Sequence, residues 1–315
     1  MSCPICKHLH IHIVMQTYDD RYGYPGQFAL MRCQHCGHAF LACDLPSSQL
    51  TELYTNYYPR KSLDISNYKP HVEQSGFTAW FDGLACSAFR WVPQDVRVLD
   101  VGCGFGESLG YHTARGCDVY GVEADENIRR VVEKFGYKVH VGLFDDKVYA
   151  QDFFDFITMD QVIEHVADPI TTLRGVARIL KPSGTAILST PNAHGWGARL
   201  FGKRWINWHS PYHLQFFTRQ SMQLAAQQAG LVLTEVKTVT NSEWLLYQWI
   251  HLVTYPKPGE PSWFWSPNKS GKVFHEKLLV KLLSILHKTK INHWVTRLFD
   301  TLSIGDNFVF VLKKP

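Results

Sequence analysis

Residues 96–106 read Val-Arg-Val-Leu-Asp-Val-Gly-Cys-Gly-Phe-Gly, and this stretch decides the fold of the chain. Its first half is mostly apolar, and its second half places glycines at 102, 104 and 106. An apolar run that opens into glycines, and then into Glu107-Ser108-Leu109, is typical of a buried parallel strand that turns into a helix. Because glycine has no side chain, such a turn lets a ligand approach the backbone closely. The stretch therefore predicts a ligand-binding strand–turn–helix unit.

The following strand indicates what kind of ligand the turn binds. Asp118–Glu123 ends in an acid 17 positions beyond Gly106, where a carboxylate can accept hydrogen bonds from both ribose hydroxyls. The third glycine follows the second after one residue, which departs from the Gly-x-Gly-x-x-Gly of dinucleotide-binding proteins. Asp100 lies two positions before the first glycine, where its carboxylate would repel a pyrophosphate. We therefore expect a nucleoside ligand without phosphates.

Strands and helices continue to alternate along the chain. Further strands are predicted at 137–142, 154–160, 185–190, 231–239 and 307–312, and helices at 170–180 and 218–230. This alternation predicts an α/β fold, with a Rossmann-like, doubly wound, seven-stranded sheet that binds ligands at the carboxyl ends of its strands. Asp100, Glu123 and Asp160 all fall on that edge.

Two cysteine pairs precede this sheet. Cys3-Pro-Ile-Cys6 and Cys33-Gln-His-Cys36 are separated by 26 residues, and a Tyr-Gly-Tyr-Pro-Gly turn at 22–26 predicts a hairpin between them. Two CxxC pairs can complete a tetrahedral zinc site. Disulfides are disfavoured because no secretion signal is visible, and a redox CxxC would not occur in duplicate. We predict a structural zinc ribbon bound by Cys3, Cys6, Cys33 and Cys36.

Composition and charge set wider limits. The chain has 315 residues, of which 45% are hydrophobic, and a formal net charge of +4. This excludes disordered and fibrous classes, and so mild a charge does not by itself indicate nucleic acid or an anionic membrane. The uncharged aromatic stretch Trp244–Tyr255 is shorter than the ~20 residues that cross a bilayer. We expect a cytoplasmic protein that can lie peripherally on the inner membrane face without spanning it.

Several motifs together resemble the class I S-adenosylmethionine (SAM) methyltransferases. They are the glycine stretch, Gly121-Val-Glu-Ala124, Phe154-Asp-Phe-Ile157, Val162-Ile-Glu-His-Val-Ala-Asp-Pro169, Leu180-Lys-Pro-Ser-Gly-Thr185 and Thr190-Pro-Asn192. The resemblance covers roughly residues 96–240 and the last strand. It implies that the glycines approach the methionine end of SAM and that Glu123 binds the ribose. The implied cofactor-binding set is Asp100, Gly102, Cys103, Gly104, Glu123, Ala124, Phe144, Asp145, Asp160 and Gln161, with Phe144 or Asp145 beside the adenine.

The segment after the fourth strand carries the candidate catalytic groups. Gln161-Val-Ile-Glu164-His165 is similar to the Glu-x-x-Glu-His of ubiquinone-pathway O-methyltransferases and of enzymes that methylate the 3′-terminal ribose of small RNAs. In those families the acids and the histidine hold a divalent metal that lowers the pKa of a substrate hydroxyl. Gln161 removes one carboxylate from this set, and His213 is the residue that could replace it. Alternatively, His165 or His213 is a general base, or His165 only packs beneath the strand.

The remaining sequence divides the chain into four segments. They are a zinc ribbon (1–45), a helical linker or lid (46–95), the methyltransferase domain (96–240 with 305–315), and an aromatic and basic helical insertion (241–304). A helix predicted over 273–286 carries a leucine stripe flanked by lysines. Such a helix either lies in a membrane interface or packs on the protein core or a second subunit.

The loop 195–209 indicates the class of acceptor. It combines tryptophans with Arg199, Lys203 and Arg204, which suits sugar rings or phosphate-bearing glycolipid head groups, and it is similar to the substrate loop of bacterial methyltransferases that decorate saccharides. The sequence therefore favours O-methylation of a saccharide, a lipid-linked glycan or another small acceptor. The alternatives are a quinone-type or RNA 2′-O-methyltransferase, a sugar C-methyltransferase, which shares the zinc ribbon, and a non-catalytic SAM-binding protein. Nucleic acid is disfavoured because no long basic stripe accompanies the loop.

Overall fold

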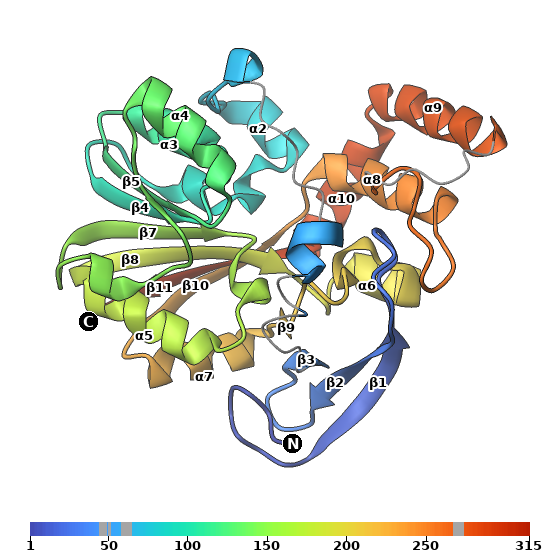
Figure 1. Cartoon of the computed structure of the whole chain (residues 1–315), viewed down its shortest axis with the longest axis horizontal. Helices are drawn as coiled ribbons and strands as arrows, with labels where there is room; N and C mark the ends of the chain where they lie inside the picture. Colours follow the sequence, from blue (N-terminus) through green and yellow to red (C-terminus); the bar gives the residue numbers. More distant parts are fainter. Residues whose placement is uncertain (44–48, 50–51, 58–64, 267–273) are drawn as a thin grey trace.

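The computed structural model describes residues 1–43, 49, 52–57, 65–266 and 274–315, and these residues form two β-sheets with flanking helices (Figure 1). The larger sheet has seven strands in the order β10-β11-β8-β7-β4-β5-β6. Its strands are β4 (Arg97–Val101), β5 (Asp118–Glu123), β6 (Lys138–Val141), β7 (Phe154–Asp160), β8 (Leu180–Pro191), β10 (Val232–Val239) and β11 (Asn307–Lys313). Only β11 runs antiparallel to its neighbours β8 and β10. The predicted Rossmann-like, seven-stranded fold class is confirmed.

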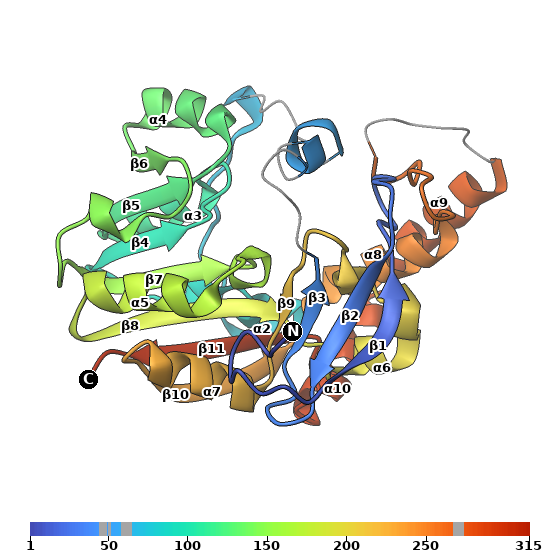
Figure 2. The same cartoon turned by 60° about the horizontal axis from the view of Figure 1, so that its bottom comes forward.

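Helices cover both faces of this sheet because its central strands are apolar on both sides. Leu99 of β4 packs in the core under α5 (Pro169–Ile179) and α7 (Arg219–Gln228). Val98, one residue earlier, points to the other face, where it packs with Leu109 of α3 (Glu107–Thr113). Figure 2 shows α3 and α5 on opposite sides of the sheet. The remaining helix of this half, α4 (Arg129–Phe135), follows β5.

The smaller sheet joins the N-terminal segment to the rest of the chain. It has the order β1-β2-β3-β9, all antiparallel, with β1 (Ile11–Thr17), β2 (Phe28–Cys33), β3 (Ala39–Ala42) and β9 (Gln215–Phe216). The fourth strand is therefore supplied by the chain that follows α6 (Trp196–Phe201). The hairpin predicted between the cysteine pairs is β1–β2.

A helical group lies between β10 and β11. It consists of α8 (Ser242–Val253), α9 (Phe274–Lys288) and α10 (Ile291–Thr301), and Figure 1 shows α9 at the periphery. Val273, the first residue of the helix predicted here, lies outside the described residues. Within the described part of the chain, no helix combines the length and apolar character needed to cross a membrane.

The predicted linker or lid at 46–95 is described only in part. The described portion holds a π-helical turn (Leu53–Tyr57), α2 (Gly76–Asp82) and short 3-10 helices at Ile65–Asn67, Leu84–Cys86 and Ala88–Trp91. The division of the chain into four segments stays a prediction; the third segment adds the strand β9 to the small sheet of the first.

Candidate active site and cysteine centre

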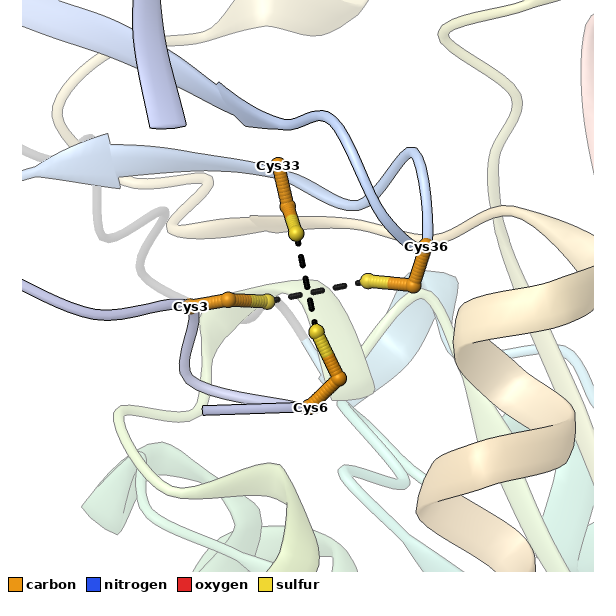
Figure 3. A group of neighbouring side chains, drawn as sticks. All are labelled: Cys3, Cys6, Cys33 and Cys36. Carbon is orange, nitrogen blue, oxygen red and sulfur yellow. Dashed lines mark hydrogen bonds between the residues drawn. The ribbon is translucent and has the colours of Figure 1, made fainter. Parts of the chain in front are cut away.

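The four predicted zinc ligands meet at one point (Figure 3). The sulfurs of Cys3 and Cys36 are 3.6 Å apart, and those of Cys6 and Cys33 are 3.5 Å apart. Tetrahedral bonds of about 2.3 Å to zinc place ligand sulfurs roughly 3.8 Å apart. The hydrogen bond between Cys3 and Cys36 lowers the pKa of the Cys3 thiol and raises that of Cys36, so Cys3 is the first of this pair to form the thiolate that binds metal. The cluster fits a structural zinc ion, as the spacing predicts.

The glycine loop after β4 has the geometry of a ligand cradle. Gly102, Gly104 and Gly106 have φ values of 74°, 56° and 81°, in the left-handed region that favours glycine. A Cβ on Gly102 would lie 2.5 Å from a methyl group of Val162, so this glycine is needed for packing. A Cβ on Gly104 would meet no described atom within 4 Å. The open space at Gly104 fits a ligand that approaches the backbone there.

Two acids brace this loop. Asp100 is buried beneath it and accepts hydrogen bonds from the Ser108 hydroxyl and, at 2.6 Å, from the Thr158 hydroxyl. Burial raises the pKa of Asp100 to about 7. Glu123, at the end of β5, accepts hydrogen bonds from the backbone N–H of Gly104 at 2.9 Å and of Asp125 at 2.8 Å. The structure thus brings both predicted acids to the loop, whereas their contacts with SAM stay a prediction.

The predicted adenine neighbours have other contacts. Asp145 accepts a hydrogen bond from the Lys147 backbone and caps the short helix Asp146–Val148. Phe144 is partly buried against the core under α5. Leu143 is 81% exposed immediately beyond β6, at the same sheet edge as Glu123. The sequence analysis did not single it out, although a large apolar residue directly after Gly142 is a visible signal.

Two further residues of the predicted cofactor set flank Glu123 and the loop. Cys103 is buried, and its sulfur would lie 2.8 Å from a Cβ on Gly121, so the thiol packs against β5 beneath the loop. Ala124 is exposed beside Glu123. Only Ala124 of these two is placed where a ligand could touch its side chain.

Glu164, His165 and His213 form a second cluster, with potential ligand atoms within 4.8 Å of one another. Glu164 is fully buried, and neither carboxylate oxygen has a hydrogen-bond partner of good geometry among the described residues. Burial raises the pKa of Glu164 to about 8, an effect that the Thr190 hydroxyl only partly offsets. A buried carboxylate without a firm partner is costly in a fold unless a ligand satisfies it.

Backbone carbonyls orient both histidines. His165 Nδ1 lies 2.9 Å from the Tyr212 carbonyl oxygen, and His213 Nδ1 lies 2.8 Å from that of Asn207. Because a carbonyl only accepts, each Nδ1 carries the hydrogen and each Nε2 keeps its lone pair. Burial lowers the pKa of His165 to about 4 and that of His213 well below its usual value. Neutral imidazoles with Nδ1–H bound to a carbonyl are typical of metal ligands.

The side chain of Gln161 does not contribute to this cluster. It has a φ of 57°, and its amide nitrogen donates to the Ser189 hydroxyl at 3.1 Å and to Asn307 Oδ1 at 3.4 Å. Asp160 is engaged beside it, because its carboxylate accepts a hydrogen bond from the same Ser189 hydroxyl. The candidate site therefore has one carboxylate and two imidazoles.

The sheet order, the glycine cradle and the acid that ends β5 define a class I SAM-dependent methyltransferase. Residues 72–236, just over half of the chain, match the family model described as "Methyltransferase domain", and the chain belongs to this family. SAM is the cofactor of these enzymes, and the open approach at Gly104 fits it.

Curated relatives include ubiquinone biosynthesis O-methyltransferases. The protein of Thiobacillus denitrificans is 28% identical over 169 residues, which cover 48% of this chain and 73% of that protein. The protein of Cereibacter sphaeroides is 35% identical over 122 residues, or 36% of this chain and 49% of that protein. Among solved structures, phosphoethanolamine N-methyltransferase 2 of Haemonchus contortus with SAM is 17% identical, with a TM-score of 0.48, covering 88% of this chain and 62% of that one.

Proposed function

We propose that this SAM-dependent methyltransferase methylates a hydroxyl oxygen of a quinone-type phenolic acceptor. The observation that carries the proposal is the Glu164–His165–His213 cluster, which follows β7 at the ligand-binding edge of the sheet. The curated relatives support this alternative better than the saccharide acceptor that the 195–209 loop favours.

Transfer between SAM and an alcohol needs alignment and a means of removing the hydroxyl proton. The Gly104 backbone, with Glu123 beside it, would hold SAM, which supplies an electrophilic methyl group when bound. Glu164 Oε and the two Nε2 atoms would hold a divalent cation, whose Lewis acidity lowers the pKa of a phenolic hydroxyl. His165 and His213 are suited to this because their lowered pKa values make them poor bases but keep them neutral and able to bind metal.

The test is formation of S-adenosylhomocysteine from SAM by the full chain. We expect turnover with 3,4-dihydroxybenzoic acid that rises on addition of Mg²⁺ or Mn²⁺, and none with UDP-glucose or a short RNA. Turnover with the sugar nucleotide and none with the catechol would restore the saccharide acceptor. His10→Ala, an exposed histidine of the ribbon, is the matched control for His213→Ala.

We further propose that α9 and α10 lie on an anionic membrane surface. Large apolar side chains on these helices are 45–82% exposed at Phe274, Leu278, Leu279, Leu282, Ile285, Leu286, Ile291, Trp294 and Leu298. Among the described residues of α9 and α10, the exposed lysines are not accompanied by any exposed Arg, Asp or Glu. An apolar face with basic flanks is the pattern of interfacial helices.

Flotation with vesicles tests this surface. We expect binding to vesicles of phosphatidylglycerol and phosphatidylcholine, weaker binding to phosphatidylcholine alone, and loss of binding in Leu282→Glu/Ile285→Glu. Val232→Glu, which changes an exposed apolar residue of β10, is the control. Protein that stays unbound on anionic vesicles would overturn the proposal.

A further inference from the structure

The turn of the ribbon hairpin is buried, although hairpin turns usually face water. All six residues of Asp19–Tyr24, which follow β1, are buried, including three charged side chains. Buried charges are costly unless they are bound. Asp19 meets this condition within the turn, because its carboxylate accepts 2.9 Å hydrogen bonds from the backbone N–H groups of Arg21, Tyr22 and Tyr24. The hairpin tip, residues 17–24, is therefore a braced element inserted into the protein.

The hairpin tip contacts one segment of the methyltransferase domain, residues 206–212, and it also contacts the insertion 241–304, where the Arg21 carbonyl accepts a hydrogen bond from the Ser262 N–H at 2.9 Å. The Ser210 hydroxyl donates to the Thr17 hydroxyl at 2.9 Å, and the Arg21 guanidinium donates to the Ile206 carbonyl. The Tyr22 ring packs edge-on against His209 and Tyr212, with centroid separations of 5.7 and 5.4 Å. Contacts thus occur at both ends and in the middle of the segment.

The same segment orients the two histidines of the candidate site. Its Asn207 carbonyl, next to the residue that Arg21 binds, holds His213, and its Tyr212 carbonyl, on the residue that Tyr22 packs against, holds His165. His209 Nδ1 lies 3.4 Å from His213 Nε2. The carbonyl that orients each imidazole therefore belongs either to a residue that the hairpin tip contacts, Tyr212, or to the neighbour of such a residue, Asn207.

A second connection leads from the ribbon to the cluster. Directly after His213, the Leu214 carbonyl accepts a hydrogen bond from the Leu41 N–H at 2.9 Å, and the Leu214 N–H donates to the Glu164 carbonyl at 2.7 Å. Gln215 then pairs with Phe40 in the small sheet. The chain on both sides of His213 is thus held by the ribbon.

We infer that the zinc ribbon is a positioning element of the acceptor site. The cysteine centre fixes the start of the β1–β2 hairpin, and the hairpin tip fixes residues 206–212, so that His165 and His213 are held beside Glu164, with potential ligand atoms of the three residues within 4.8 Å of one another. The assignment of these histidines to the acceptor site rests on the proposed function. The positioning itself is a property of the fold and can be measured without an acceptor.

Imidazole nitrogen NMR on the full-length, zinc-loaded protein tests the positioning. In the wild type we expect His165 and His213, assigned with alanine variants, to carry the hydrogen on Nδ1. Tyr22→Leu and the milder Ser210→Ala should shift both signals or mix the two tautomers, with zinc content unchanged and SAM affinity within twofold. Ile13→Ala, 58% exposed on β1, is the matched control. Signals that stay unchanged in both variants would overturn the inference.

A double-mutant cycle separates positioning from general destabilisation. With 3,4-dihydroxybenzoic acid as acceptor, Tyr22→Leu should lower kcat at least tenfold in the wild type and less than twofold in the His213→Ala background. Independent effects would instead multiply, and they would overturn the inference. If the wild type does not turn over the catechol at all, the proposed function fails while the NMR result still decides the positioning.

Discussion

The two halves of the ligand-binding edge are built in different ways. In the SAM half, β4 to β6, the contacts that shape the glycine loop join segments less than 60 positions apart, such as Gly104 with Glu123, 19 positions away, and Asp100 with Thr158, 58 positions away. In the acceptor half, the contacts join distant segments, such as Arg21 with Ile206, or Leu41 with Leu214. The first half is formed by nearby strands of the large sheet, whereas we expect the second to require the ribbon to be in place. Variants should therefore affect one half without the other.

Among these variants, His213→Ala should show the largest difference between its effect on the acceptor half and its effect on the SAM half. Removing this imidazole should lower turnover with a catechol acceptor by about 100-fold or more, because the acceptor hydroxyl loses the group that prepares it for attack. SAM affinity, measured by calorimetry, should change less than twofold. A comparable loss of SAM affinity would mean that the two halves are not separable.

Loss of the cysteine centre should be the next largest effect. Cys33→Ser removes one of the four thiolates, so we expect the zinc content and the melting temperature to fall. Turnover should decrease by about tenfold or more, which is the usual effect of removing a residue that supports a metal site. SAM should still bind. Cys117→Ser, a partly buried thiol outside the cluster, is the control. Full turnover in zinc-free Cys33→Ser would contradict the long-range construction of the acceptor half.

Gly104→Ala tests the opposite half. The left-handed backbone costs a non-glycine residue about 1–2 kcal/mol, so the free loop would relax away from the conformation that accepts SAM and binding would have to restore it, and the new methyl group points into the space open to SAM. We expect SAM affinity to fall by roughly five- to thirtyfold on that scale. At saturating SAM, kcat should stay near the wild-type value. A lower kcat with unchanged SAM affinity would place Gly104 on the acceptor side instead.

The smallest effect concerns two buried acids, one in each half. Burial raises the pKa of Asp306, which accepts hydrogen bonds from Trp205 Nε1 and the Gly197 N–H, to about 7, as it does for Asp100. The unfolded chain releases these protons near pH 4 and the folded chain near pH 7. Each acid thus contributes stability that is present below about pH 4 and lost as the pH rises through about 7.

Melting temperatures between pH 5 and 8 measure this contribution. Asp306→Asn should flatten the decline in melting temperature with rising pH and leave SAM affinity unchanged. Asp100→Asn should flatten the same decline and also weaken SAM binding, because Asp100 lies beneath the glycine loop. An unaltered slope in both variants would show that these carboxyl groups do not govern the pH dependence.

The sequence predicts the SAM half better than the acceptor half, because the contacts of the acceptor half join segments that are far apart in the sequence. The strands from β4 to β8 were located correctly because their apolar runs and glycines are local signals. His213 was predicted as a site residue because a loop after a strand end is a local signal too, and it lies beside Glu164 and His165. The burial of Asp19–Tyr24 was not found, since Asp-Asp-Arg-Tyr-Gly-Tyr is an ordinary surface turn by composition. Arg21 is buried because distant residues bind it: its guanidinium donates to the Ile206 carbonyl, 185 positions away, and lies 5.2 Å from the centroid of the Trp265 ring.

Strand β9 sets an order of events during synthesis. The strands β1 to β3 are complete once Ala42 has been made, yet their sheet receives its fourth strand only when Phe216 emerges. At about 5–20 residues per second, the ribbon waits roughly ten to thirty-five seconds for that strand. During this interval the charged tip stays in water and the sheet has an open edge. The ribbon is therefore made before the large sheet, yet its own sheet is completed only after the strands β4 to β8 have been made.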